Sequence, residues 1–215
     1  MPRKDVPSFR LVRREWSKQL KNSPGTAIIA LAKLLLPLGF WERIFACEII
    51  VHHQPALDAL TPKEVTSLGR GMKSWGEVDC FACYIAGPAW RQQNISDRLV
   101  RTWAQSPSRW WRRAALVSTV PLNNRARGGQ GDVARTLRLC RMLIRDRDDM
   151  VVKALSWALR ELSERDPLPV RSFLERYDNE LAPRGKREVA NKLRTGLKNP
   201  PRVLPSRSDP GDASA

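Results

Sequence analysis

Apolar positions recur along the chain with the 3.6-residue period of an α-helix from Phe9 to Leu197, and the two-residue alternation typical of β-strands is hard to find. The pattern therefore predicts an all-α protein. The expected helices cover residues 8–21, 26–36, 41–52, 62–73, 76–86, 94–105, 108–120, 131–144, 149–164, 167–177 and 184–197.

Breaks between these helices carry recognisable start and stop signals. Thr61–Glu64 reads as a capping box with Pro62 at the first helical position, and the asparagines and glycines within residues 123–129 mark a loop. After the last helix the chain is rich in Pro, Ser, Asp and Gly. We therefore expect one domain over residues 1–198 and a disordered tail over residues 199–215.

A short motif, a charged residue followed by a small, apolar helical run, recurs along the chain. The first residues of its five copies are Arg43, Asp79, Arg113, Lys153 and Arg187, which are 36, 34, 40 and 34 residues apart. This is the period of a two-helix repeat. Stacked repeats carry equivalent positions along one side, so the motif predicts a HEAT-like helical-repeat solenoid with a basic concave face.

The charge balance points toward a polyanionic partner. The 215 residues include 38 Lys+Arg against 22 Asp+Glu, a formal net charge of +16. A row of cations along a groove suits a phosphate backbone, which each contact binds in a salt-sensitive way. From composition alone, a basic cytoplasmic protein kept soluble by its charge is the equally plain interpretation.

Other classes of site receive little support. No second Cys-x-x-Cys pair or spaced histidine pair accompanies the scattered cysteines, so we expect reduced, mostly buried thiols, without a metal site or a disulfide framework. The cysteines are Cys47, Cys80, Cys83 and Cys140. The longest apolar run, residues 27–38, is interrupted and too short for a bilayer, and no secretory signal is recognisable. A cytoplasmic protein without membrane contact is expected.

Asp79 stands alone among cations in the repeated motif. Trp75 lies one helical turn before it, and Trp157 lies one turn after Lys153, so both indoles share the faces of the repeated positions. Two indoles and a carboxylate in a groove would attract a positively charged group. The other interpretation is that Asp79 forms a structural ion pair with a neighbour such as Arg113.

Several segments together resemble the DNA alkylation repair family of AlkD-type glycosylases, which are built from HEAT-like repeats. They are Trp75–Asp79, Trp110–Ala115, Val152–Glu161, Asn179–Pro183 and Lys186–Glu188. The match covers roughly residues 40–197. Residues 5–14 resemble a segment that in this family usually follows an additional N-terminal helical pair, which we expect this chain to lack.

The resemblance implies excision of N3- and N7-alkylated purines from duplex DNA, without flipping of the damaged base into a pocket. Asp79 would be the catalytic carboxylate, Trp75 and Trp157 the aromatic walls against the sugar of the lesion, and Arg113 a backbone contact near it. The expected DNA-binding residues are Arg43, Arg112, Arg113, Lys153 and Arg187. An alkylated purine is already cationic and leaves as a neutral base, so neither a general acid nor a cofactor or metal is required.

A rival interpretation is a non-catalytic helical-repeat scaffold that binds nucleic acid or an acidic protein. A solvent-reachable pocket shared by Trp75, Asp79 and Trp157 favours the enzyme, whereas a buried Asp79 paired with Arg113 favours the scaffold. The loop Arg125–Gly129 is either a phosphate contact or a plain connection. We expect a monomer that associates with the bacterial-type nucleoid when bound to DNA.

Overall fold

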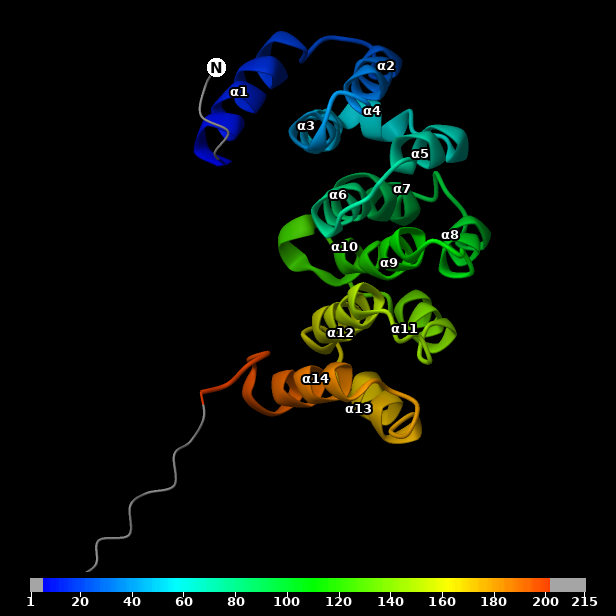
Figure 1. Cartoon of the computed structure of the whole chain (residues 1–215). Helices are drawn as coiled ribbons and strands as arrows, with labels where there is room; N and C mark the ends of the chain where they lie inside the picture. Colours follow the sequence, from blue (N-terminus) through cyan, green and yellow to red (C-terminus); the bar gives the residue numbers. More distant parts are fainter. Residues whose placement is uncertain (1–5, 202–215) are drawn as a thin grey trace, which may run out of the picture.

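The computed structural model describes residues 6–201, and this part of the chain is helical without any β-strand (Figure 1). The all-α prediction is confirmed. Most of the tail predicted to be disordered, from residue 202 onward, lies outside the described residues. The elements are α1 (Val6–Gln19), α2 (Gly25–Leu35), α3 (Phe40–Val51), α4 (Gln54–Asp58), α5 (Pro62–Gly69), α6 (Trp75–Phe81), the π-helix η1 (Ala82–Ala86), α7 (Gly87–Arg91), α8 (Asp97–Ala104), α9 (Arg109–Val117), α10 (Val120–Asn123), the 3₁₀-helix η2 (Arg125–Arg127), α11 (Val133–Met142), α12 (Asp149–Ser163), α13 (Pro167–Arg176) and α14 (Pro183–Thr195).

Ten of these helices form two rows, with α1 packed against α3 (Figure 1). In the first row α3, α6, α9, α12 and α14 each pack against the next, and each also packs against a helix of the second row, which comprises α2, α5, α8, α11 and α13. Their buried apolar side chains form one continuous cluster, which includes Ile50, Phe81, Leu116 and Leu159. The five positions of the repeated motif fall one on each helix of the first row.

Two helix starts show how local sequence sets this frame. The Thr61 hydroxyl accepts from the Glu64 amide (3.2 Å), which confirms the predicted start of α5, but the Glu64 carboxylate binds Lys33 of α2 (3.2 Å) instead of closing the capping box. Ser74 forms a complete box: its hydroxyl accepts from the Glu77 amide (3.3 Å), and the Glu77 carboxylate accepts from the Ser74 amide (2.9 Å). This box fixes where α6 begins.

The helix predicted over residues 76–86 is longer than expected. It passes from α6 through the π-helix η1 into α7 and ends at Arg91. Pro88 has no backbone N–H and its ring crowds the carbonyl one turn earlier, so a widened π-turn lets the chain continue past it. A Cβ on Gly87 would lie 2.6 Å from the Pro121 ring and 2.8 Å from the Ser118 carbonyl oxygen, so only glycine allows this close approach.

The predicted pattern missed two short helices, α4 and α10. The His53 imidazole caps α4, because its Nδ1 atom accepts from the Ala56 amide (3.1 Å). Neither helix is long enough to show a full apolar period, and helices this short depend on tertiary packing. Within the described chain all four cysteines are free and buried.

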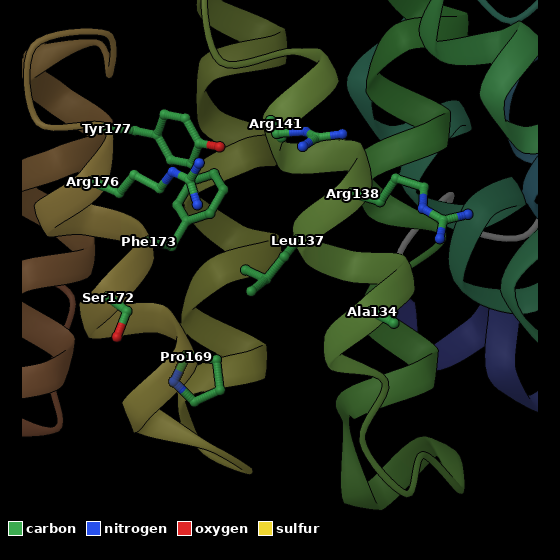
Figure 2. Close-up of a pocket in the computed structure, with 9 residues that line it drawn as sticks. All are labelled: Ala134, Leu137, Arg138, Arg141, Pro169, Ser172, Phe173, Arg176 and Tyr177. Carbon is green, nitrogen blue, oxygen red and sulfur yellow. The ribbon is translucent and has the colours of Figure 1, made fainter.

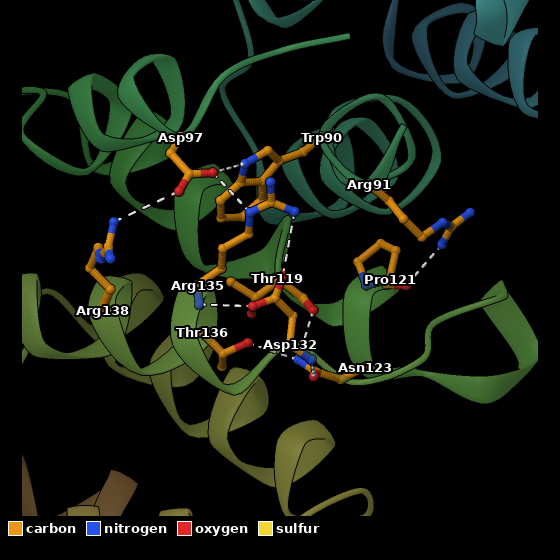
Figure 3. A network of polar contacts seen from close by, with 10 residues as sticks. All are labelled: Trp90, Arg91, Asp97, Thr119, Pro121, Asn123, Asp132, Arg135, Thr136 and Arg138. Atoms are coloured by element: carbon orange, nitrogen blue, oxygen red, sulfur yellow. Dashed lines mark hydrogen bonds and ion pairs between the residues drawn. The ribbon is translucent and has the colours of Figure 1, made fainter. Parts of the chain in front are cut away.

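Asp97, at the start of α8, joins α7 and α11 through its carboxylate. One oxygen accepts from the Trp90 indole (2.9 Å) and from Arg135 Nε (2.8 Å), and the other lies 3.7 Å from Arg138 (Figure 3). The Arg135 guanidinium also lies over the Trp90 ring, 5.0 Å from its centroid. The network therefore fastens two neighbouring second-row helices to the end of α7.

Asn123 is buried where α10 meets α11, and all of its amide contacts are internal (Figure 3). Its Nδ2 atom donates to the Thr119 carbonyl (3.0 Å) and the Thr136 hydroxyl (2.9 Å), and its Oδ1 atom accepts from the Asp132 amide (2.9 Å). A buried polar group left without its partner costs more than the net worth of one hydrogen bond.

We therefore expect Asn123→Leu to lower the free energy of unfolding by about 1–3 kcal/mol, because the buried Thr136 hydroxyl and the partly buried Asp132 amide both lose a partner. Thermal denaturation followed by circular dichroism measures the change. Gln105→Leu, at an exposed amide after α8, is the control and should shift the melting temperature little. Equal shifts for the two variants would contradict this account.

Candidate active site

Asp79 and Arg113 form a bidentate ion pair between α6 and α9. Arg113 Nε donates to one carboxylate oxygen (2.8 Å) and Nη2 to the other (2.7 Å), while Nη1 donates to the Met150 carbonyl at the start of α12 (2.6 Å). The Arg113 side chain is 6% exposed and that of Asp79 is 18% exposed. One guanidinium thus links three successive helices of the first row and leaves part of the carboxylate open to solvent.

The environment of Asp79 has opposing effects on its protonation. Burial raises the pKa of the Asp79 carboxyl, and the hydrogen bond and positive charge of Arg113 lower it, so that the net result is a pKa above that of an ordinary aspartate. The carboxylate is therefore poorly hydrated, and one arginine supplies most of its stabilisation. The Coulomb attraction between such a carboxylate and a positive charge brought next to it is strong.

The two tryptophans predicted beside Asp79 differ in their settings. Trp75 is the first residue of α6 and is 62% exposed, so its indole has little contact with the rest of the protein. Trp157 of α12 is half-buried, and its Nε1 atom donates to Glu161 one turn later (3.0 Å). Asp79 thus contacts Arg113 directly. Trp75 lies on the same helix as Asp79, and Trp157 lies on another helix of the same row.

Cys83, one turn beyond Asp79, reveals which charges gather here. Its pKa is raised to about 12, chiefly by burial; Asp79 and Glu161 raise it further, while Arg127 and Arg113 lower it. Charged groups from α6, α9, α12 and the loop after α10 thus all influence the pKa of one buried thiol. Sequence reasoning did not assign Glu161 or Arg127 to the site, although the position of Glu161 one turn after Trp157 was a usable signal.

Arginines that were expected to contact DNA have internal partners instead. Arg43 is 8% exposed, donates to a backbone carbonyl of α5 (3.3 Å) and lies 3.9 Å from the buried Glu77 carboxylate. Arg112 binds Asp146 (2.6 Å) and two backbone carbonyls of the preceding turn (3.1 and 2.8 Å). The prediction that the repeated cations stand in an open groove is wrong for Arg43 and Arg113, because each neutralises an acid of the adjacent helix.

Two of the expected DNA contacts remain accessible. Lys153 of α12 has a side chain that is 34% exposed and pairs with Asp149 one turn earlier (2.6 Å). Arg187 of α14 is exposed and forms no ion pair with another described residue. A pair within one exposed helical turn is weak, so Lys153 remains able to exchange its partner for a phosphate.

A hollow of about 490 Å³ lies in the second row, between α11 and α13 (Figure 2). Its lining includes Phe173, Tyr177 and three arginines, Arg138, Arg141 and Arg176. In Figure 2 Arg138 extends away from α13, which agrees with its contact to Asp97, so the guanidinium groups do not converge on one point. The hollow is lined by second-row helices and contains none of the residues around Asp79.

Between residues 6 and 201 no three His, Cys, Asp or Glu side chains are grouped so that they could hold a metal ion. None of the helices in this range combines the length and apolar character needed to cross a bilayer.

Comparison with known proteins gives one finding. A family model described as DNA alkylation repair enzyme matches residues 5–193, which is most of the chain and includes every residue of the candidate site. No curated protein and no solved structure matches the chain significantly. By this match and by its all-helical fold, the chain belongs to the family of DNA alkylation repair enzymes.

Proposed function

We propose that the protein is a DNA glycosylase that hydrolyses the N-glycosidic bond of N3- and N7-alkylated purines, on a HEAT-like solenoid whose first row faces the DNA. The observation that carries this proposal is the Asp79 carboxylate, which is largely buried, is held by Arg113 and lies on the same helix as the exposed Trp75. Family membership supplies the DNA substrate class and the link to alkylation repair.

Hydrolysis of this glycosidic bond requires little more from the protein than one oriented negative charge. When the glycosidic bond breaks, the bonding electron pair leaves with the cationic purine, which becomes a neutral base and needs no proton from the enzyme. Positive charge then develops on the sugar at C1′ and O4′. The ionised Asp79 carboxylate stabilises this charge and orients a water molecule, which adds to C1′ and releases a proton.

Arg113 takes a different role here from the one expected. All three of its observed donors face protein acceptors, so it acts as a positioning residue that fixes both oxygens of Asp79. A bidentate guanidinium restricts the rotation of a carboxylate more than a single hydrogen bond does. This preorganisation leaves little rearrangement to occur during the reaction.

The tryptophans bind the cationic nucleotide in this proposal. Trp75 is exposed and free to contact the sugar or the charged base, and Trp157 is oriented by its hydrogen bond to Glu161. An indole face attracts a cation by about 0.5–2 kcal/mol, depending on how dry the site is. Lys153 and Arg187 bind the phosphate backbone along the same row.

The alternative, a DNA-binding scaffold without catalysis, is favoured by the same ion pair. Removing one partner of a buried pair is strongly destabilising, so Asp79 and Arg113 have a structural use even without a reaction. The alternative gives no reason for Asp79 to remain partly open to solvent beside an exposed tryptophan. We therefore prefer the enzyme, and base release from methylated DNA separates the two.

Asp79→Asn is expected to slow release of 7-methylguanine and 3-methyladenine from methylated duplex DNA by roughly 10²–10³-fold, because asparagine keeps an acceptor for Arg113 but lacks the charge. Chromatography of the released bases measures the rate. Binding to undamaged duplex should stay equal or become tighter, since a negative charge is removed. Wild-type rates in this variant would refute the mechanism.

Because Asp79→Asn leaves Arg113 without its counterion, a variant that spares the ion pair is needed as well. Trp75→Ala removes an exposed side chain and should lower the release rate by roughly 5–10-fold at an unchanged melting temperature. Leu168→Ala, at an exposed apolar residue of α13, serves as control. Equal rates for both variants would remove Trp75 from the site.

The pH dependence follows from the raised pKa of Asp79. Only the ionised carboxylate stabilises the sugar cation, so the release rate should fall as the pH is lowered through that pKa, with the acid limb above the ordinary aspartate value of about 3.9. Initial rates, corrected for release by Asp79→Asn at each pH, give the profile. An acid limb at or below the ordinary value would contradict the assignment.

Lys153→Ala and Arg187→Ala should each weaken binding to every duplex sequence and make the slope of log affinity against log salt shallower by about 0.9. Fluorescence anisotropy at several salt concentrations measures this slope. The matched controls are Lys63→Ala and Arg98→Ala, at exposed residues of α5 and α8 in the second row. Unchanged slopes for the first-row variants would show that Lys153 and Arg187 face away from the DNA.

A further inference from the structure

The loop between α10 and α11, residues 124–131, lies in the repeat whose spacing is longest. The motif residues are 34 to 36 residues apart elsewhere, but Arg113 and Lys153 are 40 apart. The added length contains the 3₁₀-turn Arg125–Arg127 and a run of glycines after it. We call residues 124–131 the basic loop.

The first support of the basic loop comes from α7. Arg91 donates through Nη1 to the carbonyl oxygen of Pro121 in α10 (3.0 Å) and to that of Arg127 (2.8 Å), so one guanidinium ties the turn of the loop to α10 (Figure 3 shows the contact to Pro121). Burial lowers the pKa of Arg91, and its guanidinium donates to these backbone carbonyls.

The second support comes from the turn after α12. Arg165 donates through Nε to the Asn123 carbonyl (2.7 Å) and through Nη2 to the Gly129 carbonyl. A Cβ on Gly129 would lie 2.7 Å from the backbone of Leu122, and Gly128 adopts a left-handed φ of 76°. Glycines at these two positions therefore let the loop fold tightly back on α10, which gives a long connection a fixed shape.

The basic loop adjoins the candidate active site at two points. The Arg127 guanidinium lies over the Tyr84 ring, 5.0 Å from its centroid, and Tyr84 is in η1, which directly continues the helix of Asp79. Asn124 donates to Glu161 (2.9 Å), the same carboxylate that accepts from Trp157. In Figure 1 the segment after α10 projects on the side of the molecule where α6 and α12 lie.

The side chains that hold the loop, Arg91 and Arg165, come from other segments, whereas the cations that the loop itself carries are Arg125 and Arg127. Arg125 is exposed, and neither Arg125 nor Arg127 forms an ion pair with any residue that the structure describes. Two cations without counterions repel a positively charged base, so they are poorly suited to bind the lesion itself. Their charge is complementary to the phosphates on either side of it.

We propose that the basic loop is a phosphate-binding element, in which Arg125 and Arg127 contact the backbone of duplex DNA next to the nucleotide held at Asp79. The position relative to the lesion rests on the proposed function, whereas the contact with duplex DNA does not require catalysis. Arg127, steadied by Tyr84, makes the fixed contact, and the exposed Arg125 makes the adaptable one.

The test compares two double variants with the same change in charge. Arg125→Ala with Arg127→Ala should make the salt slope for an undamaged duplex shallower by about 1.8, which is 0.9 for each lost phosphate contact, and should weaken binding at every salt concentration. Lys63→Ala with Arg98→Ala, at exposed second-row residues, should leave the slope within about 0.5 of the wild type. Melting temperatures show whether each variant is folded.

Arg127→Lys separates charge from geometry. It keeps the cation but loses the planar group over Tyr84, so it should retain most of the slope and bind less tightly than the wild type. A slope for the loop double variant equal to that of the wild type, or to that of the second-row double variant, would overturn the proposal.

The outcomes also distinguish this inference from the proposed function. A shallower slope in a protein that releases no methylated base would leave the loop contact standing and reject the glycosylase. Release of bases by the wild type, together with an unchanged slope in the loop variant, would support the glycosylase and reject the loop contact.

Discussion

The bidentate contact between Asp79 and Arg113 is the interaction on which the rest of the structure around the candidate site depends. It joins α6 to α9, and the third donor of the same guanidinium reaches α12, so three helices share one charge centre. Removing either partner would leave a charge in a largely buried setting, which typically costs about 3–5 kcal/mol. Stability and the proposed reaction therefore need the same carboxylate in the same orientation.

The basic residues behind the net charge of +16 fall into two groups with different roles. Arg43, Arg91, Arg113 and Arg165 bind acids or backbone carbonyls and hold helices and loops together. Arg187, Arg125 and Arg127 form no ion pair with a described residue, and Lys153 pairs only with Asp149 of its own helix; all four occur on the first row or on the loop beside it. Counting basic residues overstates the DNA contacts, because buried guanidinium groups serve folding.

A π-turn and a long loop adapt a regular array of helices to a local site. The π-helix after Asp79 carries the chain past Pro88 and places Tyr84 under the guanidinium of Arg127. The loop that carries Arg127 is fixed by arginines from α7 and from the turn after α12. Irregular segments of this kind are often found at functional sites, where a standard helix cannot present the required groups.

The sequence by itself determined the all-α class, most helix positions, the helical-repeat spacing and the placement of Trp75 and Asp79 on one helix, because these follow from local periodicity and capping. It left open whether Asp79 was paired or free for chemistry. Only the tertiary structure decided that it is paired with Arg113, that Arg43 is buried against Glu77, that Arg127 lies over Tyr84, and that Asn124 binds Glu161. These contacts join residues more than thirty positions apart, and whether an arginine neutralises a buried acid or stays exposed depends on which helix packs beside it.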